Sequence, residues 1–397
     1  MKILMVLSDN TFPPDIRVEK EARSLISSGH KVHLLVRGSS NQKKEEIVNN
    51  IHVHRFFVPT YDMPFLGYST YFFIHRYKLT YRIIRTIRKY GIQALHVHDL
   101  PYGMAAAMAG KIYNLPVIFD MHEHYVDLMK SNFEVQGMNV PLLPSLLSYE
   151  ERLVCSNAKK VVVVAEEGIN RVAQQHKISK DKIVLVSNTA DIQLLSRFEE
   201  DHKKHKHEKE KDDIILSYIG IFSKDRGIDV LLKAMPLILD KHENVKLLLV
   251  GVDPYVEELT DLIKDLGIQN KVKFTGWVPI SKAMEYVIES DLCTVPHQST
   301  PQRKTTLPHK IFQYMYFKKP VVVSDIPPLK RIVTEAKCGL VFKADDHTDC
   351  AQKVNEILDN PKILFEMGEN GRKAVQRIYN WNEDAKKLLK LYEELSG

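Results

Sequence analysis

Hydrophobic residues in the first half of the chain form short runs separated by longer amphipathic segments. Short apolar runs predict buried strands, and apolar positions three and four residues apart predict helices. We predict strands at residues 3–7, 32–36, 51–57, 94–97, 117–119, 161–164 and 183–186. We predict helices at residues 16–28, 71–90, 103–113, 142–158 and 167–175. This alternation is typical of a parallel sheet with helices on both faces.

A second series of the same kind begins at residue 214. Its predicted strands, each separated from the next by a helical pattern, are residues 214–219, 246–250, 272–274, 292–295, 321–323 and 340–342. Two closing helices are predicted at residues 363–377 and 382–395. The pattern therefore predicts an α/β protein with two doubly wound, Rossmann-like domains facing across a cleft. Ligands of such sheets bind outside the carboxyl ends of the strands.

We place the first domain at residues 1–195 and the second at residues 214–375. A C-terminal helix at residues 376–397 is expected to pack back on the first domain. Residues 196–213, between the domains, are strongly charged. Three histidines in this segment could suggest a metal site, but the lysines among them would repel a cation. The segment is therefore predicted to be a solvated linker.

The composition agrees with a folded protein of two or three domains. The 397 residues are 44% hydrophobic and 27% charged, with a formal net charge of +6. The four cysteines form no Cys-x-x-Cys pair, which argues against a disulfide framework or zinc site and favours a reducing compartment. The first residues are typical of a strand rather than a signal peptide, and no apolar run reaches about 18 residues. We therefore expect a cytoplasmic protein.

The loop after the first strand of the second series is a candidate phosphate site. Neither Gly-x-Gly-x-x-Gly nor a Walker P-loop occurs in the chain. Instead the loop reads GIFSKDRG, in which Gly220 permits close backbone approach and Lys224 and Arg226 supply two cations. Two cations at a strand–loop–helix junction suit a diphosphate. The alternative is a loop whose charges are simply solvated.

Two other strand ends carry candidate ligand-binding residues. FTGWVP places Trp277 and Val278 where they could form an apolar wall for a flat base, although Trp277 could equally be a core residue. VIFDMHEHYVD places Asp120, His122 and Glu123 just past a buried strand. These polar side chains are expected to face the ligand; a structural role, or metal binding through His-x-His, is the alternative.

Two helix starts add further candidates. Arg17 opens the first predicted helix and could reach a phosphate or pair with Glu21, four residues on. In the segment 305–325, Thr305 is predicted to cap a helix that carries Lys310 and Gln313. A lysine and a polar side chain at a helix N-terminus favour anions and hydroxyls. An ordinary αβ unit with a solvated polar face is the alternative.

Taken together, these motifs resemble the family 4 retaining glycosyltransferases of the GT-B fold, also called glycosyl transferases group 1. The resemblance covers nearly the whole chain and is carried by the order and spacing of its motifs. The matching segments are FPPDIRVEKEARSLISSGHKVHLL, HVHDLPYG, FDMHEHY, VLVSNTAD, YIGIFSKDRGIDVLLKAM, KFTGWVP and LPHKIFQYMYFKKPVVVSD, followed by Pro327 and Glu335.

The resemblance implies an enzyme that moves a sugar from a nucleotide-sugar donor to an acceptor with retained anomeric configuration. It implies no cofactor and no obligatory metal. The donor would lie mainly on the second domain, and the acceptor, a glycan or lipid-linked glycan of the cell surface, mainly on the first. By this resemblance, Lys224 and Arg226 would bind the diphosphate, His122 would approach the donor sugar, and the residues at the base and ribose would be Trp277, Val278 and Gln313.

The chain departs from the family pattern at three positions. Ile221 replaces an arginine, Gln313 replaces a glutamate, and Thr305 stands where the longer motif has its first glutamate. These changes leave two other functions open. One is a nucleotide-sugar 2-epimerase on the same fold, for which the acidic residues near Asp120 could abstract a proton. The other is a catalytically silent subunit that binds a true transferase.

The segment 65–89 is aromatic at its start and basic towards its end, with no acidic residue. Phe72, Phe73 and Ile74 could enter a membrane interface. Anionic head groups could be met by Arg76, Lys78, Arg82, Arg85, Arg88 and Lys89. We expect peripheral attachment at the inner face of a membrane; an ordinary helix that is apolar inside and basic outside is the alternative. The absence of a recognisable binding module argues against nucleic acid as a partner.

Overall fold

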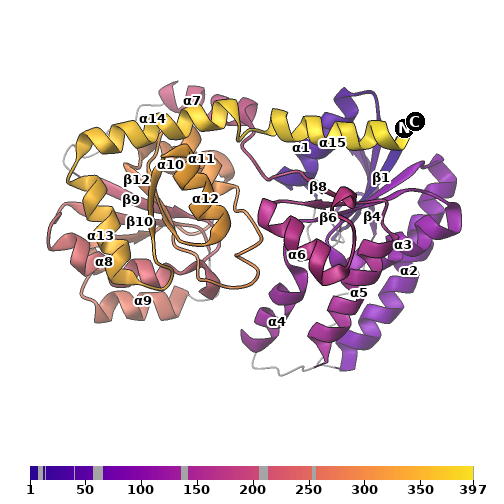
Figure 1. Cartoon of the computed structure of the whole chain (residues 1–397), viewed down its shortest axis with the longest axis horizontal. Helices are drawn as coiled ribbons and strands as arrows, with labels where there is room; N and C mark the ends of the chain where they lie inside the picture. Colours follow the sequence, from indigo (N-terminus) through magenta and orange to yellow (C-terminus); the bar gives the residue numbers. More distant parts are fainter. Residues whose placement is uncertain are drawn as a thin grey trace. The chain divides into compact units, whose positions relative to one another are not determined.

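The computed structural model divides the chain into two compact units (Figure 1). The first unit comprises Met1–Ser187 together with Asp384–Gly397, and the second comprises Asn188–Glu383. The structure describes residues 1–7, 12–13, 15–39, 41–56, 66–135, 142–204, 213–252 and 256–396. Side chains of residues 66–75, 131–135 and 396 lie outside this description, and these include Phe72, Phe73 and Ile74 of the predicted membrane segment.

The first unit is built on an eight-stranded sheet with the order β3-β4-β2-β1-β5-β6-β7-β8. Its strands are β1 (Lys2–Leu7), β2 (Lys31–Arg37), β3 (Glu45–Val48), β4 (Ile51–Phe56), β5 (Ala94–His98), β6 (Val117–Met121), β7 (Lys160–Val163) and β8 (Ile183–Leu185). All neighbours are parallel except β3, which pairs antiparallel with β4. The seven predicted strands are confirmed. β3 was not predicted, because Glu-Glu-Ile-Val at a sheet edge lacks an apolar run.

The helices of the first unit follow the strands in the order expected for a doubly wound sheet. They are α1 (Ile16–Ser27), α2 (Leu66–Tyr90), α3 (Leu100–Tyr113), α4 (Tyr125–Val135), α5 (Leu143–Asn157) and α6 (Glu166–His176), with the short η1 (Lys180–Lys182). The last helix of the chain, α15 (Trp381–Ser396), supplies Leu388, Leu391 and Tyr392 to the buried interior. The Tyr392 hydroxyl lies 2.9 Å from His96 Nδ1, so this helix reaches the polar interior of the first unit.

The second unit contains a six-stranded parallel sheet with the order β11-β10-β9-β12-β13-β14. Its strands are β9 (Ile214–Ile219), β10 (Val245–Val250), β11 (Val272–Phe274), β12 (Leu292–Val295), β13 (Val321–Ser324) and β14 (Gly339–Phe342). Its helices are α7 (Ile192–Lys204), η2 (Lys224–Arg226), α8 (Ile228–Leu239), α9 (Val256–Asp265), η3 (Gln269–Lys271), α10 (Ile280–Glu289), α11 (Lys310–Tyr316), α12 (Pro327–Ala336), α13 (His347–Leu358) and α14 (Pro361–Arg377). The predicted α/β class with two Rossmann-like domains is confirmed.

The predicted linker at 196–213 is wrong in its first half. Residues up to Lys204 belong to α7, whose Leu195 is 2% exposed and whose Glu199 accepts a bond of 3.1 Å from Arg372. The charged composition concealed the apolar face of this helix. Residues 205–212 lie outside the described residues. The structure also divides the units after Ser187 and within α15, so it does not share the predicted boundaries at 195 and 375.

Among the helices that the structure describes, none combines the length and the apolar composition that crossing a bilayer requires. Because ligands of parallel sheets bind at the carboxyl ends of the strands, candidate sites lie after β1, β5 and β6 in one unit and after β9 and β12 in the other. In each unit these strands are neighbours in the sheet, so the loops that follow them emerge side by side.

Candidate functional site

In the first unit, the register of the sheet brings two sequence motifs together. β5 and β6 pair in parallel, and His98 at the end of β5 is the partner of Asp120 in β6. The motif HVHD is therefore placed beside FDMHEH. Asp99 and His122 follow these two strand ends, and the His122 amide donates a hydrogen bond of 2.9 Å to Asp99 Oδ1. The segment HVHDLPYG contains His98 and Asp99, but the sequence analysis did not predict either as a site residue.

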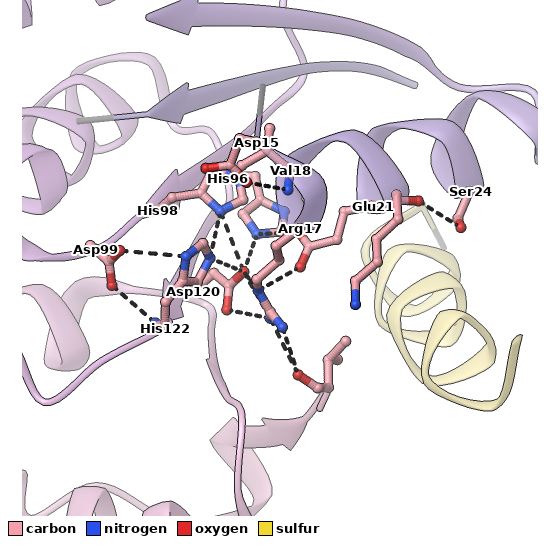
Figure 2. Close-up of polar contacts among 12 residues, drawn as sticks. Asp15, Arg17, Val18, Glu21, Ser24, His96, His98, Asp99, Asp120 and His122 are labelled. Atoms are coloured by element: carbon pink, nitrogen blue, oxygen red, sulfur yellow. Dashed lines mark hydrogen bonds and ion pairs between the residues drawn. The ribbon is translucent and has the colours of Figure 1, made fainter. Parts of the chain in front are cut away.

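Asp120 is the centre of this group (Figure 2). Its carboxylate is fully buried and receives Arg17 Nη2 at 2.9 Å on Oδ1 and His122 Nε2 at 3.0 Å on Oδ2. Burial acts to raise the pKa of Asp120, but the Arg17 guanidinium and then His122 hold it well below its usual value. Asp120 is therefore held as an anion, and it is a weak base.

Arg17 opens α1, where the Asp15 side chain caps the helix by accepting a bond of 3.0 Å from the Val18 amide. Its guanidinium is 5% exposed and also donates to the Val186 carbonyl at 3.2 Å and approaches Glu21 Oε1 at 3.0 Å. The structure thus corrects the first of the two interpretations of Arg17. The side chain pairs with buried carboxylates, and its small exposed fraction leaves little surface with which to receive a phosphate.

His122 is held between two carboxylates. Its Nε2 lies 3.0 Å from Asp120 Oδ2, and its Nδ1 lies 3.5 Å from Asp99 Oδ2. Burial opposes protonation, but Asp99 and Asp120 together raise the pKa of His122 to about 9, so the ring is an imidazolium at neutral pH. The His122 side chain is 17% exposed, whereas Asp120 behind it is completely buried. His122 can therefore present a positive N–H group at the edge of the unit.

His98 lies beside the positively charged His122 as a neutral imidazole. Its Nδ1 lies 3.1 Å from His122 Nε2, and burial lowers the pKa of His98 to about 3. His98 Nδ1 also lies 3.4 Å from Asp120 Oδ2, and a neutral His98 ring carries a hydrogen on only one of its two nitrogens. Burial raises the pKa of Asp99 to about 6, and the charge of Glu123, which is half-buried beside this group, contributes to the rise.

Four buried side chains of this region have the composition of a metal site. Potential ligand atoms of Glu21, His96, His98 and Asp120 all lie within 4.8 Å of one another. Carboxylates and imidazoles are ligands that zinc accepts. However, Arg17 already approaches both carboxylates, at 3.0 and 2.9 Å, so a metal ion would sit beside a fixed positive charge. The donor set does not favour a metal here, and metal independence stays a prediction.

In the second unit, the strand ends of β9 and β12 bring a different group together. Gly220 follows β9 with a φ of +137°, and an added Cβ would lie 2.6 Å from Lys310 Nζ. Lys310 is the first residue of α11, and its Nζ lies 3.8 Å from the centre of the Tyr218 ring. Arg226, in η2, approaches His297 Nε2 at 3.3 Å through Nη1. Gly220, Arg226 and Lys310, which the sequence predicted, thus belong to one cluster.

This cluster contains residues that sequence reasoning missed. Arg303 is 6% exposed and donates through Nε to Asp225 Oδ2 at 2.7 Å, and Asp225 also accepts from the Ser223 hydroxyl at 2.5 Å. His297, 1% exposed, is surrounded by Arg226, Arg303 and Lys310, and burial and these cations hold its pKa well below the usual value. Arg303 lies in the turn before α11, where no motif or periodicity distinguishes it from a surface arginine.

The remaining predicted residues of the second unit lie around this cluster or away from it. Trp277, after β11, is 72% exposed, so the alternative of a core residue is wrong; Val278 beside it is half-buried. Gln313 is half-buried, one turn after Lys310 on α11. Thr305 does not cap a helix: it lies in a turn, and α11 begins at Lys310 after Pro308. Lys224 is an exposed residue of η2.

Comparisons with known proteins agree across both units. The family model described as Glycosyltransferase Family 4 matches residues 16–194, and the one described as Glycosyl transferases group 1 matches residues 199–374. An uncharacterized glycosyltransferase of Methanocaldococcus jannaschii is 24% identical, over 99% of this chain and 98% of the relative. A sucrose-phosphate synthase structure from Thermosynechococcus elongatus has a TM-score of 0.80 at 19% identity, covering 100% of this chain and 99% of the other. The structure of Anabaena HepE with UDP-glucose has a TM-score of 0.72 at 16% identity, covering 99% and 100%.

The buried ion pair generates a stability prediction. Asp120→Asn leaves the Arg17 guanidinium without its principal anion, and we expect the free energy of unfolding to fall by about 3–5 kcal/mol. The control is Asp229→Asn, which breaks an exposed pair with Lys233 and should cost less than about 1 kcal/mol. Urea unfolding followed by circular dichroism measures both. Equal, small effects of the two substitutions would contradict the central position of Asp120.

Proposed function

The chain belongs to the family 4, group 1 glycosyltransferases of the GT-B fold, and on this basis we propose that it transfers a sugar from a nucleotide-sugar donor with retention of anomeric configuration. The family makes it a glycosyltransferase enzyme; retention and the roles of individual residues are our proposal. The observation that supports it most is the cluster of Arg226, Arg303, Lys310 and His297, which holds more positive than negative charge.

We assign the donor diphosphate to this cluster. Gly220 has no side chain to separate the backbone and the Lys310 amine from a phosphate, and Arg226 Nε is a buried donor without a protein partner among the described residues. As the sugar leaves, negative charge develops on the diphosphate, and cations already fixed around it stabilise that charge. Lys224, exposed on the same turn, is assigned to the outer side of the diphosphate. These cations supply what a divalent ion would otherwise provide, so we propose a reaction without an obligatory metal or cofactor.

The nucleoside is assigned to the residues around the cluster. Trp277, whose side chain is largely exposed, offers a flat apolar surface for the base, with Val278 beside it. Gln313, on the same helix as Lys310, is assigned to the ribose hydroxyls, and Thr305 to the edge of the donor site. HepE, which is similar in fold, was solved with UDP-glucose, and this supports a nucleotide-sugar as the donor.

We assign His122 to the reacting sugar. An imidazolium between Asp99 and Asp120 can donate a strong hydrogen bond to a sugar hydroxyl and stabilise a donor in the reactive position. The same electrostatics weigh against the epimerase alternative, because Asp120 has a pKa well below its usual value and is a poor base for proton abstraction. An assay of sugar transfer and donor hydrolysis by the pure protein distinguishes our proposal from the alternative of a catalytically silent subunit.

We propose that the acceptor is a glycan or lipid-linked glycan of the cell surface, reached at a membrane. Support comes from α2, where Lys78, Arg82 and Arg85 are exposed and line a groove of about 710 Å³ with residues of β2, β3 and β4. Leu79 and Ile83 on the same helix are buried, so α2 also fits the alternative of an ordinary helix that is apolar inside and basic outside. Arg76 is not part of this face, because it pairs with Glu150 at 2.6 Å.

The membrane proposal predicts sedimentation with anionic vesicles. Replacing Lys78, Arg82 and Arg85 by Gln should reduce binding to phosphatidylglycerol vesicles at least tenfold, because each basic residue contributes about 1 kcal/mol near an anionic surface. The control variant replaces three exposed lysines of the second unit, Lys264, Lys362 and Lys373, by Gln. It has the same net charge as the variant of α2. Equal binding by the two triple variants, or binding that ignores salt, would refute attachment through α2.

The donor proposal predicts selective stabilisation by one class of nucleotide-sugar. In a thermal-shift panel of UDP-, GDP-, ADP- and CDP-sugars, we expect at least one to raise the melting temperature, and Arg226→Ala to abolish that rise. The control, Arg377→Ala, removes an exposed arginine of the same unit and should leave the rise intact. No stabilisation by any donor would overturn the donor site. Stabilisation without transfer or donor hydrolysis would favour the silent subunit.

A further inference from the structure

We propose that the donor site of the second unit binds its diphosphate together with a proton, which the Lys310 side-chain amine takes up as the anion arrives. This inference rests on the proposed function, because it concerns the same site. It adds a coupling between pH and donor affinity that neither the fold nor the family motifs contain. It also gives Lys310 a chemical task that differs from that of the permanently charged Arg226.

The first observation is the position of Lys310 Nζ. The residue is 7% exposed, and Nζ has no hydrogen-bond partner among the residues that the structure describes. Nζ lies 3.8 Å from the centre of the Tyr218 ring, and it would be 2.6 Å from a Cβ added at Gly220. An ammonium group has three donors, and burying it without acceptors is strongly unfavourable. The neutral amine is therefore favoured over the ammonium form until a hydrogen-bond acceptor enters the site.

The second observation is the charge that faces Lys310 from the surrounding segments. Arg226 of η2 and Arg303 of the turn before α11 both repel a positive charge at Nζ, and Asp225 attracts it. The Asp225 carboxylate already accepts a hydrogen bond of 2.7 Å from Arg303 Nε. The charge of Arg303 therefore offsets much of the attraction that Asp225 would exert on a positive Nζ. His297 and Tyr218 complete the surroundings, and neither is an anion. Burial first, and then Arg226 and Arg303, hold the pKa of Lys310 well below its usual value.

A diphosphate reverses these conditions. Its oxygens supply acceptors for the amine, and its negative charge offsets Arg226 and Arg303, so the ammonium becomes the favoured form. The amine then takes one proton from solvent and forms a charge-assisted hydrogen bond; no covalent bond is made or broken. The free protein thus avoids the cost of a third buried cation beside Arg226 and Arg303, while the occupied site gains one. Departure of the nucleotide returns the proton to solvent.

This coupling has a measurable consequence for affinity. When binding takes up one proton, the association constant falls about tenfold for each unit of pH between the pKa of the free amine and its higher pKa in the occupied site. A nucleotide-sugar is the suitable probe because its diphosphate is esterified at both ends and does not titrate near neutral pH. Any proton taken up at pH 7.5 therefore comes to the protein.

The test is isothermal titration calorimetry of the full chain with the panel sugar that binds most tightly. The binding enthalpy is measured at pH 7.5 in three phosphate-free buffers of different ionisation enthalpy, and its slope against that enthalpy gives the protons taken up. We expect a value above zero that rises towards one when the titration is repeated at pH 8.5. A value of zero with tight binding overturns this inference and leaves the donor site standing. If no panel sugar binds, the proposed function and this inference both fail.

Two variants assign the proton to Lys310. Lys310→Met should bind the donor at least tenfold more weakly and without proton uptake. It should also raise the melting temperature of the free protein, because an apolar chain replaces an unpartnered amine. Lys330→Met, an exposed lysine of α12, should leave affinity and proton uptake unchanged. Proton uptake that persists in Lys310→Met would place the proton on another group, with His297 the nearest alternative, and would overturn the assignment.

Discussion

The buried ion pair between Arg17 and Asp120 is the interaction on which the polar interior of the first unit depends. Asp120 is completely buried, and without Arg17 its charge would cost several kcal/mol. The same guanidinium bonds the Val186 carbonyl, so α1, β6 and the segment after β8 meet at one side chain. Asp99, and then the anionic Asp120, hold His122 beside them as a cation. The pair of Arg17 and Asp120 thus fixes the local packing and contributes to the charge offered at the edge of the unit.

The two units use buried charge in opposite ways. In the first, Arg17 and His122 lie against the carboxylates of Asp120, Asp99 and Glu21, so positive charge does not exceed negative charge. In the second, Arg226, Arg303 and Lys310 face a single carboxylate, that of Asp225. A balanced group positions a side chain, whereas an unbalanced one is stabilised by an anion that enters from solvent. This contrast supports our proposal that the second unit recognises the donor phosphates and that His122 of the first unit orients the sugar.

Sequence reasoning identified what depends on local pattern and strand order. The strands were predicted because their apolar runs are continuous, and Asp120, His122, Gly220 and Arg226 were found because they follow those runs. The edge strand β3 and the helix α7 were missed, since charged residues hide their apolar positions. Arg303 and Tyr392 act through partners 78 and 296 residues away, and no local pattern records such contacts. Arg17 could be placed at a helix start, but only the fold decided between Asp120 and a phosphate.

The charge of His122 tests the account most directly, because it follows from Asp120, Asp99 and the neutral His98 together. Nuclear magnetic resonance of ring-labelled histidines, with His122 assigned by its loss in His122→Gln, measures its titration in the folded protein. The account predicts a pKa of about 9, well above the ordinary value of 6.5, and a fall towards that value in Asp99→Asn. A pKa at or below 6.5 in the unmodified protein would contradict it.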